Sequence, residues 1–355
     1  MTSDKNEERK KIVIKKPPKN PSKSSEEPAE EQCVENVSGI GAINFEIEDL
    51  PRVGKTTARK LRDAGFNTVN SLATISVKQL QEDAGIGEKT AYNLTEAARE
   101  AMKIGFQTGA DVWERRKHQS SISTNSRKLD EALGGGIETG CFTEFYGEFR
   151  TGKTQIMHQL CVNVQLSKKE GGLKGNALYI DTEGTFRPER IIQMAEAKAL
   201  DYNEVLGNIH YARVYSSDHQ ILITKGLARK ISEENIKLVI VDSLIAHFRS
   251  EYIGKGALAE RQQKLNSHIH DLIRIADMFP EVAIVITNQA QSKPDVFFGD
   301  PTRATGGNIL AHNATVRIYL RKGKGEQRVA KIIDAPNLPE SEAVFTIMDT
   351  GIQDI

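Results

Sequence analysis

From about residue 121 onward, short apolar runs alternate with stretches whose apolar residues recur at helical spacing. The apolar runs are residues 141–146, 177–180, 238–241 and 282–287, and the amphipathic stretches include 154–165 and 189–199. Buried strands separated by helices are typical of a mostly parallel sheet covered on both faces. The pattern therefore predicts an α/β core over residues 121–355.

Residues 41–102 show a different, helical pattern that occurs twice. The segments 53–61 and 86–94 each read apolar residue, glycine, polar residues and then a helix, which is the pattern of a helix-hairpin-helix. Gly65 and Gly85 are placed where helices would end, and Ser76 with Gln79 fits a capping box. We expect a small all-α domain here.

In each copy the glycine lets the turn approach a phosphate, and the next backbone N–H groups lie at a helix N-terminus. The first copy adds the cations Arg52, Lys55, Arg59 and Lys60. These features favour contact with a DNA backbone. A protein-interaction or purely structural module is the alternative, because the charge of the segment is roughly balanced.

Two further segments flank this domain. Residues 1–40 are rich in Lys, Glu, Pro and Ser, which predicts a disordered charged tail or, alternatively, a basic arm that touches DNA or a partner. Residues 103–120 form a linker with Phe106 and Trp113 in polar surroundings. Exposed aromatic side chains are unfavourable in a free linker, so we expect both to dock, on this chain's own core or elsewhere.

Composition excludes several classes of protein. The chain has 355 residues, of which 38% are hydrophobic and 27% charged, as in ordinary globular proteins. It contains no apolar run of about 18 residues and no apolar segment near its N-terminus, so neither a membrane span nor a secretory signal is expected. Cys33, Cys141 and Cys161 lack the close spacing of a zinc ribbon or disulfide framework, which favours a reducing compartment. The formal net charge is zero, so nucleic-acid binding must rest on local patches.

A phosphate-binding motif follows the first apolar run. Residues 147–154, GEFRTGKT, fit G-x-x-x-x-G-K-[ST] between a predicted strand and a predicted helix. In this motif backbone N–H groups cradle phosphate oxygens, the lysine meets the β/γ-phosphates and the hydroxyl binds Mg²⁺. The nucleotide contacts that we expect are Gly147, Glu148, Phe149, Arg150, Thr151, Gly152, Lys153, Thr154 and Gln155.

Acidic residues end two of the other apolar runs. Asp242 follows 238–241 and is expected to face the metal through water, together with Thr154. The segment YIDTEGT, residues 179–185, offers a group to orient the attacking water. Glu183 is the better candidate because Gly184 places it on a turn, Asp181 is its competitor, and an ordinary acid on a surface turn is the alternative.

Several long motifs occur together and in order: Ser123-Thr124, residues 134–137 (GGGI), 147–155, 179–190 (YIDTEGTFRPER), 285–289 (VITNQ) and 306–308 (GGN). Over residues 41–355 the chain resembles the RecA-like strand-exchange recombinases, most closely the archaeal RadA type and its eukaryotic counterpart. The resemblance implies a RecA-like P-loop ATPase core behind a helix-hairpin-helix domain. It also implies ATP and Mg²⁺ as cofactors, filaments on single-stranded DNA, pairing with homologous duplex, and a role in homologous recombination and double-strand break repair.

The resemblance also implies roles for individual residues near the nucleotide. Lys153, Glu183 and Gln289 are expected to be catalytic, with Gln289 as the γ-phosphate sensor at the base of a DNA-binding loop. Arg190 and Gln193 match positions near the adenine, and His312 matches a position that reads the nucleotide state. Residues 334–340, with Asp334 and Pro336, resemble the segment that caps ATP on the neighbouring protomer.

Two loops, about 249–264 and 291–305, are expected to face DNA. The residues expected to contact it are Arg249, Tyr252, Lys255, Arg261, Lys293, Phe297, Arg303, Gly306 and Gly307, with the two aromatic side chains stacking between bases. The cations of the second loop are offset by Asp295 and Asp300. A mobile loop with incidental charge is therefore the alternative.

Residues 106–109, FQTG, resemble the family's F-x-x-A polymerisation motif, in which Phe fills a pocket on the adjacent protomer and a short strand extends its sheet. This chain has Gly109 where the family usually has Ala, and the missing methyl weakens pocket filling by about 0.8 kcal/mol if it is fully buried. Such head-to-tail contacts generate open helices or rings.

Three alternatives stay open from the sequence. They are a recombinase paralogue or mediator without strand exchange, a RecA-like hexameric helicase, and a non-enzymatic DNA-binding scaffold. Expected partners are single- and double-stranded DNA, further copies of the chain and recombination mediators, but no membrane. The expected location is the archaeal cytosol or nucleoid, or a nucleus if the Lys-rich tail is an import signal.

Overall fold

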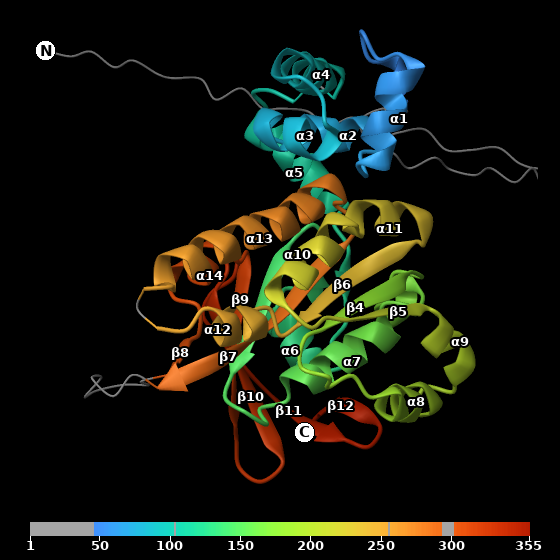
Figure 1. The fold of residues 1–355 in the computed structure, drawn as a ribbon. Helices are drawn as coiled ribbons and strands as arrows, with labels where there is room; N and C mark the ends of the chain where they lie inside the picture. The colour runs from blue at the N-terminus through green and yellow to red at the C-terminus, as the bar shows by residue number, and fades with distance from the viewer. Residues whose placement is uncertain (1–45, 103, 255, 293–301) are drawn as a thin grey trace, which may run out of the picture. The chain divides into compact units, whose positions relative to one another are not determined.

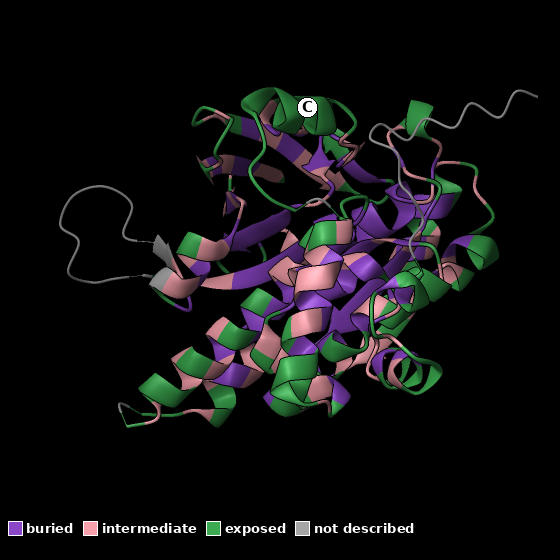
Figure 2. Ribbon diagram, turned by 90° about the horizontal axis from the view of Figure 1, so that it is seen from above, coloured by how far each residue is buried: buried purple, intermediate pink, exposed green. Residues whose placement is uncertain are grey.

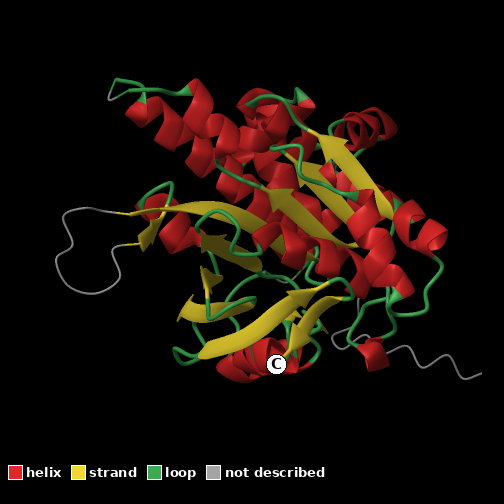
Figure 3. Ribbon diagram, turned by 90° about the horizontal axis from the view of Figure 1, so that it is seen from below, coloured by secondary structure: helices red, strands yellow, loops and turns green. Residues whose placement is uncertain are grey.

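The computed structural model describes residues 46–102, 104–254, 256–292 and 302–355, so the predicted tail 1–40 lies outside the described residues. A large sheet runs through the core in the order β12-β11-β10-β9-β3-β7-β6-β4-β5, with β8 paired to the end of β7 (Figures 1 and 3). Its strands are β3 Phe142–Gly147, β4 Asn176–Asp181, β5 Ile209–Arg213, β6 Ile236–Asp242, β7 Ala283–Ser292, β8 Thr302–Ala304, β9 Val316–Lys322, β10 Gln327–Asp334, β11 Glu342–Met348 and β12 Gly351–Asp354. Neighbours from β9 through β5 pair in parallel, and β10, β11 and β12 continue the sheet as an antiparallel meander.

Helices cover both faces of this sheet. Along β6, Leu238 and Ile240 join the apolar cluster that includes α7, whereas Val239 and Val241 join the cluster that includes α13. The central strands are buried in Figure 2, as expected for parallel strands between two helical layers. The helices of the core are α6 Arg127–Ala132, α7 Lys153–Asn163, α8 Pro188–Glu196, α9 Tyr202–Gly207, α10 Ser217–Lys225, α11 Leu227–Glu233, α12 Ala246–Glu251, α13 Leu258–Met278 and α14 Asn308–Asn313, with the short η2 Lys168–Glu170 and the small β1 Ser121–Ile122 and β2 Ile137–Glu138 ladder. The predicted α/β class is confirmed.

The N-terminal helices form their own apolar cluster, which includes Leu61, Leu72 and Leu94. Their bounds are η1 Ile47–Asp49, α1 Lys55–Asp63, α2 Val69–Thr74, α3 Val77–Ala84 and α4 Glu88–Ala101. Gly54 and Gly87 are the N-caps of α1 and α4, in corresponding places of the two sequence copies. The limits of this domain, 41–102, stay a prediction.

The expected helix ends in this region are largely as the sequence indicates. Gly65 and Gly85 have φ angles of +89° and +58°, which glycine adopts at little cost. The Ser76 hydroxyl accepts a hydrogen bond of 3.2 Å from the Gln79 backbone. The Gln79 side chain, however, donates to Asp83 at 3.0 Å, so the capping box is only half formed. The Gln79 side chain binds Asp83, one turn further along α3, and so does not reach the Ser76 backbone N–H as a capping box requires.

The predicted linker contains a helix, and its two large aromatic side chains are exposed. It contains α5 Gly109–Lys117, which begins with a capping box between Thr108 and Asp111. Phe106 and Trp113 are exposed, with relative exposures of 111% and 59%. Docking on the chain's own core is therefore wrong for these two side chains, and both are available to another molecule.

The first predicted DNA loop is shorter than expected. Residues 249–251 belong to the end of α12, and α13 begins at Leu258. The connection between the two helices therefore covers only residues 252–257. The charged stretch LAERQQKLNSH, residues 258–268, forms the first half of α13. Its residues lie at helical spacing, and this spacing outweighs their loop-like composition. The second loop begins and ends in a hairpin in which Ala290, Gln291 and Ser292 pair with residues of β8. No helix in the described parts of the chain is long and apolar enough to cross a membrane.

Candidate functional site

The loop between β3 and α7 has the curled backbone of a phosphate cradle. Arg150 and Gly152 have φ angles of +63° and +102°, and the Thr151 hydroxyl donates to the Glu148 carbonyl at 2.9 Å across the turn. A Cβ atom at Gly147 would overlap the Leu320 carbonyl of the adjacent β9. Glycine is therefore required at this position to let the loop leave the sheet beside its neighbouring strand.

Lys153 begins α7 and curls back over this loop. Its Nζ donates to the carbonyls of Gly147 at 2.9 Å and of Glu148 at 2.8 Å. Burial lowers the pKa of Lys153, and the carboxylates of Asp242 and Glu183 oppose that shift. The two hydrogen bonds hold the Lys153 amino group at the loop, where the motif places the β/γ-phosphates.

Thr154 and Asp242, the two predicted metal ligands, are in direct contact. The Thr154 hydroxyl donates to Asp242 Oδ2 at 2.8 Å, and the hydroxyls of Tyr179 and Thr287 also donate to this carboxylate. Burial raises the pKa of Asp242, and the three hydrogen bonds lower it in part. A hydroxyl and a carboxylate beside a phosphate cradle suit Mg²⁺, which keeps several water and phosphate ligands. The residues present thus fit a nucleotide with Mg²⁺.

Glu183 faces the same site from the turn after β4. Its Oε1 accepts hydrogen bonds from the Ser243 hydroxyl at 2.7 Å and from Gln289 Nε2 at 3.2 Å. Gln289 in turn lies on β7, directly opposite Gly147 of the loop in the parallel register. The structure therefore brings together the three residues expected to be catalytic, Lys153, Glu183 and Gln289.

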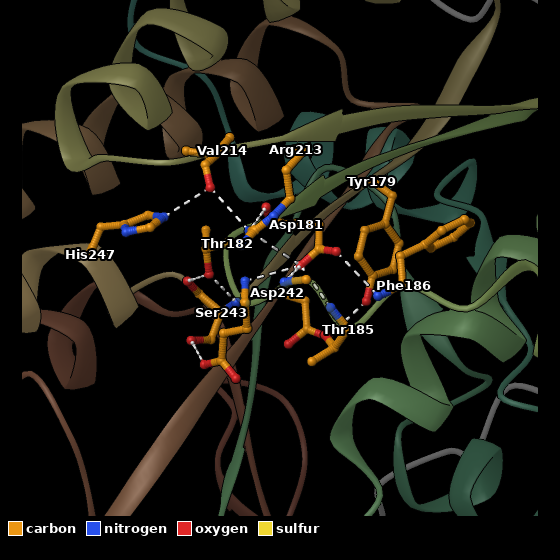
Figure 4. A network of polar contacts seen from close by, with 12 residues as sticks. Tyr179, Asp181, Thr182, Thr185, Phe186, Arg213, Val214, Asp242, Ser243 and His247 are labelled. Atoms are coloured by element: carbon orange, nitrogen blue, oxygen red, sulfur yellow. Dashed lines mark hydrogen bonds and ion pairs between the residues drawn. The ribbon is translucent and has the colours of Figure 1, made fainter.

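Asp181, the competitor of Glu183, is fully buried and holds the turn in shape. Its carboxylate accepts hydrogen bonds from the backbone N–H groups of residues 183–186, at 2.6–3.2 Å, and from the Tyr211 hydroxyl at 3.1 Å. Figure 4 shows this fan of contacts beside Asp242 and Ser243. With its oxygens so engaged, Asp181 is unsuited to activate water, and Glu183 is the better candidate.

These groups line one cavity of about 450 Å³. The phosphate loop from Phe149 to Gln155 forms one wall, and Glu183, Asp242 and Gln289 face it from the ends of three other strands. Ligands of open α/β sheets bind at this carboxyl edge of the strands. The cavity is thus where the sequence places the triphosphate.

Arg190 and Gln193, expected near the adenine, lie together at the side of the loop. Arg190 Nε donates to the Gln155 side chain at 2.7 Å, and its Nη1 donates to Gln193 Oε1 at 2.9 Å and to the Asp349 carbonyl at 2.6 Å. Arg190 therefore joins α7, α8 and the β11–β12 turn into one rim beside Gln155.

The structure does not bring the expected cap residues to their own phosphate loop. β10 runs antiparallel to β9, and Asp334 pairs with Arg317 at the start of β9, whereas Gly147 pairs with Leu320 near its end. The start of β10 lies beside the loop, since a Cβ atom at Gly152 would be 3.9 Å from Arg328 Cγ. Asp334 follows six residues later, roughly 20 Å along the strand at about 3.3 Å per residue, so Asp334 and the exposed Pro336 lie toward the opposite edge of the sheet. His312 is exposed near the end of α14, where the chain returns to the start of β3 through the Thr315–Phe142 hydrogen bond.

Some of the residues expected to contact DNA have partners within the protein, and others lie outside the described residues. Arg249 bonds Gln289, and Tyr252 is partly buried with its hydroxyl close to Lys264. Arg261 lies on α13, and Gly306 and Gly307 precede α14, where a Cβ at Gly306 would crowd Ile245 at 2.8 Å. Lys255, Lys293 and Phe297 lie outside the described residues, as does the side chain of Arg303.

Three residues of the site escaped the sequence analysis: Tyr179, Ser243 and Thr287. Each is a polar group in, or just after, a strand that ends at the site. Thr287 ends the apolar run of β7, on the strand next to that of Asp242. A polar residue at the carboxyl end of a buried strand is the feature that would have indicated it.

Comparisons with known proteins agree with this geometry. A model of the Rad51 family matches residues 115–355, and a model of a SAM-like helix-hairpin-helix tandem matches residues 46–100. The chain is 52% identical over 309 residues to the DNA repair and recombination protein RadA of Aeropyrum pernix, an alignment that covers 87% of this chain and 97% of that protein. The expected RecA-like recombinase resemblance is confirmed. Since the family model covers more than half of the residues and the relative is this similar over nearly its whole length, the chain belongs to the Rad51 family.

Proposed function

We propose that this protein is an ATP-dependent DNA strand-exchange recombinase that assembles head-to-tail on single-stranded DNA, pairs it with homologous duplex and acts in homologous recombination and double-strand break repair. The position of Gln289 is the main support. Its amide contacts Glu183 in the nucleotide site, and only one residue later Ala290 begins the hairpin that leads to the predicted second DNA loop. The end of β7 thus connects the nucleotide site with the predicted second DNA loop.

The chain's own residues account for the ATPase step. Lys153 would hold the phosphates, and Thr154 and Asp242 would hold the metal ion. Glu183 orients water and takes its proton as the water oxygen bonds to the γ-phosphorus and the bond from that phosphorus to the leaving ADP breaks. Bound Mg²⁺ supplies charge neutralisation at the phosphates. Ser243 and Gln289 fix the Glu183 carboxylate through two hydrogen bonds, so the base is positioned before substrate arrives.

Assembly through Phe106 is supported by a matching surface on the same chain. β5 is the terminal strand of the sheet order, and beside it lies a cavity of about 280 Å³ lined by Leu178, Ala212 and Leu222 among others. An exposed Phe on one copy can fill this cavity on the next while its backbone adds to the edge strand. The donor and receiver surfaces differ, so each added copy leaves both open and the assembly grows.

The same arrangement explains the positions of the cap residue Asp334 and of His312, which is expected to read the nucleotide state. Because Asp334 and His312 lie away from their own phosphate loop, they serve the site of the next protomer in a head-to-tail array. ATP bound between copies then stabilises the assembled state by its differential affinity for it. Recombination mediators are further partners that the proposal includes, and the cytosol or nucleoid of an archaeal cell is its proposed location.

A strand-exchange assay with purified protein tests this function. With ATP and single-stranded DNA, the wild type is expected to form helical filaments and joint molecules with homologous duplex, whereas Lys153→Ala forms neither. Normal ATP binding without strand exchange would instead indicate a paralogue or mediator. Duplex unwinding without filaments would indicate a hexameric helicase, and joint molecules that persist in Lys153→Ala would indicate a scaffold.

A further inference from the structure

A chain of three side chains leads from the nucleotide site to the first predicted DNA loop. Arg249 Nη1 donates to Gln289 Oε1 at 3.0 Å, and Gln289 Nε2 donates to Glu183 Oε1 at 3.2 Å. Arg249 belongs to α12, which ends two residues later at Glu251, just before the connection 252–257. The sequence assigns Arg249 to DNA phosphates, but its described partner is the amide of Gln289.

The chemistry of the two groups fixes the direction of the amide. A guanidinium has only hydrogen-bond donors, so it can bind only the oxygen of a side-chain amide. With Oε1 turned to Arg249, the NH₂ group of Gln289 must point the other way, toward Glu183 and the cavity. A donor in that direction can bind a carboxylate or a phosphate oxygen, whereas a flipped amide would present its oxygen to these anions.

α12 is anchored firmly enough to hold Arg249 in place. Phe248 is fully buried and stacks on His268 with ring centroids 5.6 Å apart. The Glu251 carboxylate accepts hydrogen bonds from the Ser217 backbone at 2.8 Å and from the Ser217 hydroxyl, at the start of α10. Arg249 itself is half-buried between these two anchors.

We propose that Arg249 is a positioning residue, which pins Gln289 Oε1 so that the Gln289 NH₂ group faces the γ-phosphate side of the cavity. The inference rests on the proposed ATPase and adds a residue that links α12, and hence the first DNA loop, to the nucleotide site. It predicts that Arg249 affects the response to nucleotide even when no DNA is present.

Arg249→Met and Arg249→Lys test this role. Met keeps the length of the stem without a donor, and we expect kcat for ATP to fall about tenfold and KM to rise, because the misoriented Gln289 NH₂ group no longer binds the γ-phosphate in bound ATP or in the transition state. The preference for a non-hydrolysable ATP analogue over ADP, measured by equilibrium binding without DNA, falls by a similar factor. Lys, which also only donates, restores most of both.

The matched control is Arg274→Met on α13, which removes a half-buried guanidinium bonded to Asp271 at 2.9 Å. We expect wild-type kinetics from it. In a Gln289→Ala background, Arg249→Met is expected to have little further effect, because the amide that it orients is gone. Circular dichroism of each variant checks that the fold is retained, and the Lys variant keeps the test valid if the Met variant unfolds.

The alternative role, a contact with DNA phosphate alone, gives a different result. In that case Arg249→Met changes neither the kcat measured in the absence of DNA nor the preference for the ATP analogue. It reduces the slope of log K against log salt concentration, for binding of single-stranded DNA, by about 0.7. That outcome, or additive effects of the two substitutions, overturns the inference. A wild type without DNA-stimulated ATPase would instead contradict the proposed function itself.

Discussion

The Thr154 hydroxyl donates a 2.8 Å hydrogen bond to Asp242 Oδ2, which ties the first turn of α7 to the end of β6. Tyr179 donates to the same oxygen at 2.7 Å, so one buried carboxylate organises three elements around the phosphate loop. The contact explains how two residues 88 positions apart can act on one metal ion.

Asp242→Asn should separate the structural and metal-binding roles of this carboxylate. The substitution removes a buried charge, and the surrounding hydroxyls can turn to accept from the new NH₂ group, so the free energy of unfolding should change by only about 1 kcal/mol. ATP hydrolysis should fall by about 100-fold or more because the anionic ligand is lost. Activity within threefold of wild type would contradict the metal-ligand role, and Thr154→Ser, which keeps its hydroxyl, is the active control.

Glu183→Gln should mainly reduce ATP hydrolysis, whereas Asp181→Ala should mainly reduce the free energy of unfolding. The Glu183 variant keeps its fold and its ATP binding but hydrolyses at least about 100-fold more slowly, so its filaments persist with ATP. The Asp181 variant leaves four backbone N–H groups without their acceptor and should lose about 3 kcal/mol or more of unfolding free energy. Urea denaturation and phosphate release measure the two effects, and a stable but inactive Asp181→Ala would reverse the assignment.

Complementary variants should reveal the head-to-tail interface. Phe106→Ala removes the donor side chain, and Leu222→Glu places a charge in the cavity beside β5. Each variant alone is expected to stay monomeric, because each lacks one of the two surfaces. Mixed together, the intact Phe106 of one should dock in the intact cavity of the other and give a 1:1 dimer in sedimentation analysis. Filaments from either variant alone would contradict this interface.

Gly109→Ala should strengthen assembly. Gly109 is the first residue of α5, and a Cβ atom there meets nothing within 4 Å in the single chain, so alanine is tolerated. Its methyl adds apolar contact worth about 0.8 kcal/mol if it is fully buried at the interface. The critical concentration for filament formation, measured by light scattering, should fall about threefold to fourfold. An unchanged value would show that this residue lies outside the contact.

The fold was predictable where a strand is buried on both faces. The four apolar runs all became central strands, whereas β5 was missed because its sequence, IHYAR, is partly exposed at the sheet edge and reads as polar. The first DNA loop was overestimated for a similar reason, since the charged residues that begin α13 have the composition of a loop although they lie at helical spacing.

The candidate site was predictable to the extent that it follows a contiguous motif. Lys153 and Thr154 are fixed by the phosphate loop itself. The contacts of Asp242 with Thr287 and of Glu183 with Ser243 depend on parallel register, in which Asp181 lies opposite Asp242 and Gly147 opposite Gln289. Register is set by the packing of the whole sheet, so no local pattern in the sequence determines it.

Acid should destabilise this protein in part through His268. Its Nε2 lies 3.0 Å from Gln220 Nε2 and accepts from it only while the ring is neutral, and burial lowers the pKa of His268 to about 4. The unfolded chain takes up this proton near pH 6.5 and the folded chain only near pH 4, so stability falls as pH drops below 6.5 and levels off below 4. Between pH 7.5 and 5.0 the loss from this residue is about 2 kcal/mol.

Denaturation by urea across this pH range, on wild type and His268→Phe, measures the effect. The Phe variant loses the Gln220 contact at every pH but takes up no proton, so its unfolding free energy should depend less steeply on pH than that of the wild type. Parallel curves for wild type and His268→Phe would contradict the argument, because the buried ring would then titrate alike in the folded and unfolded chain.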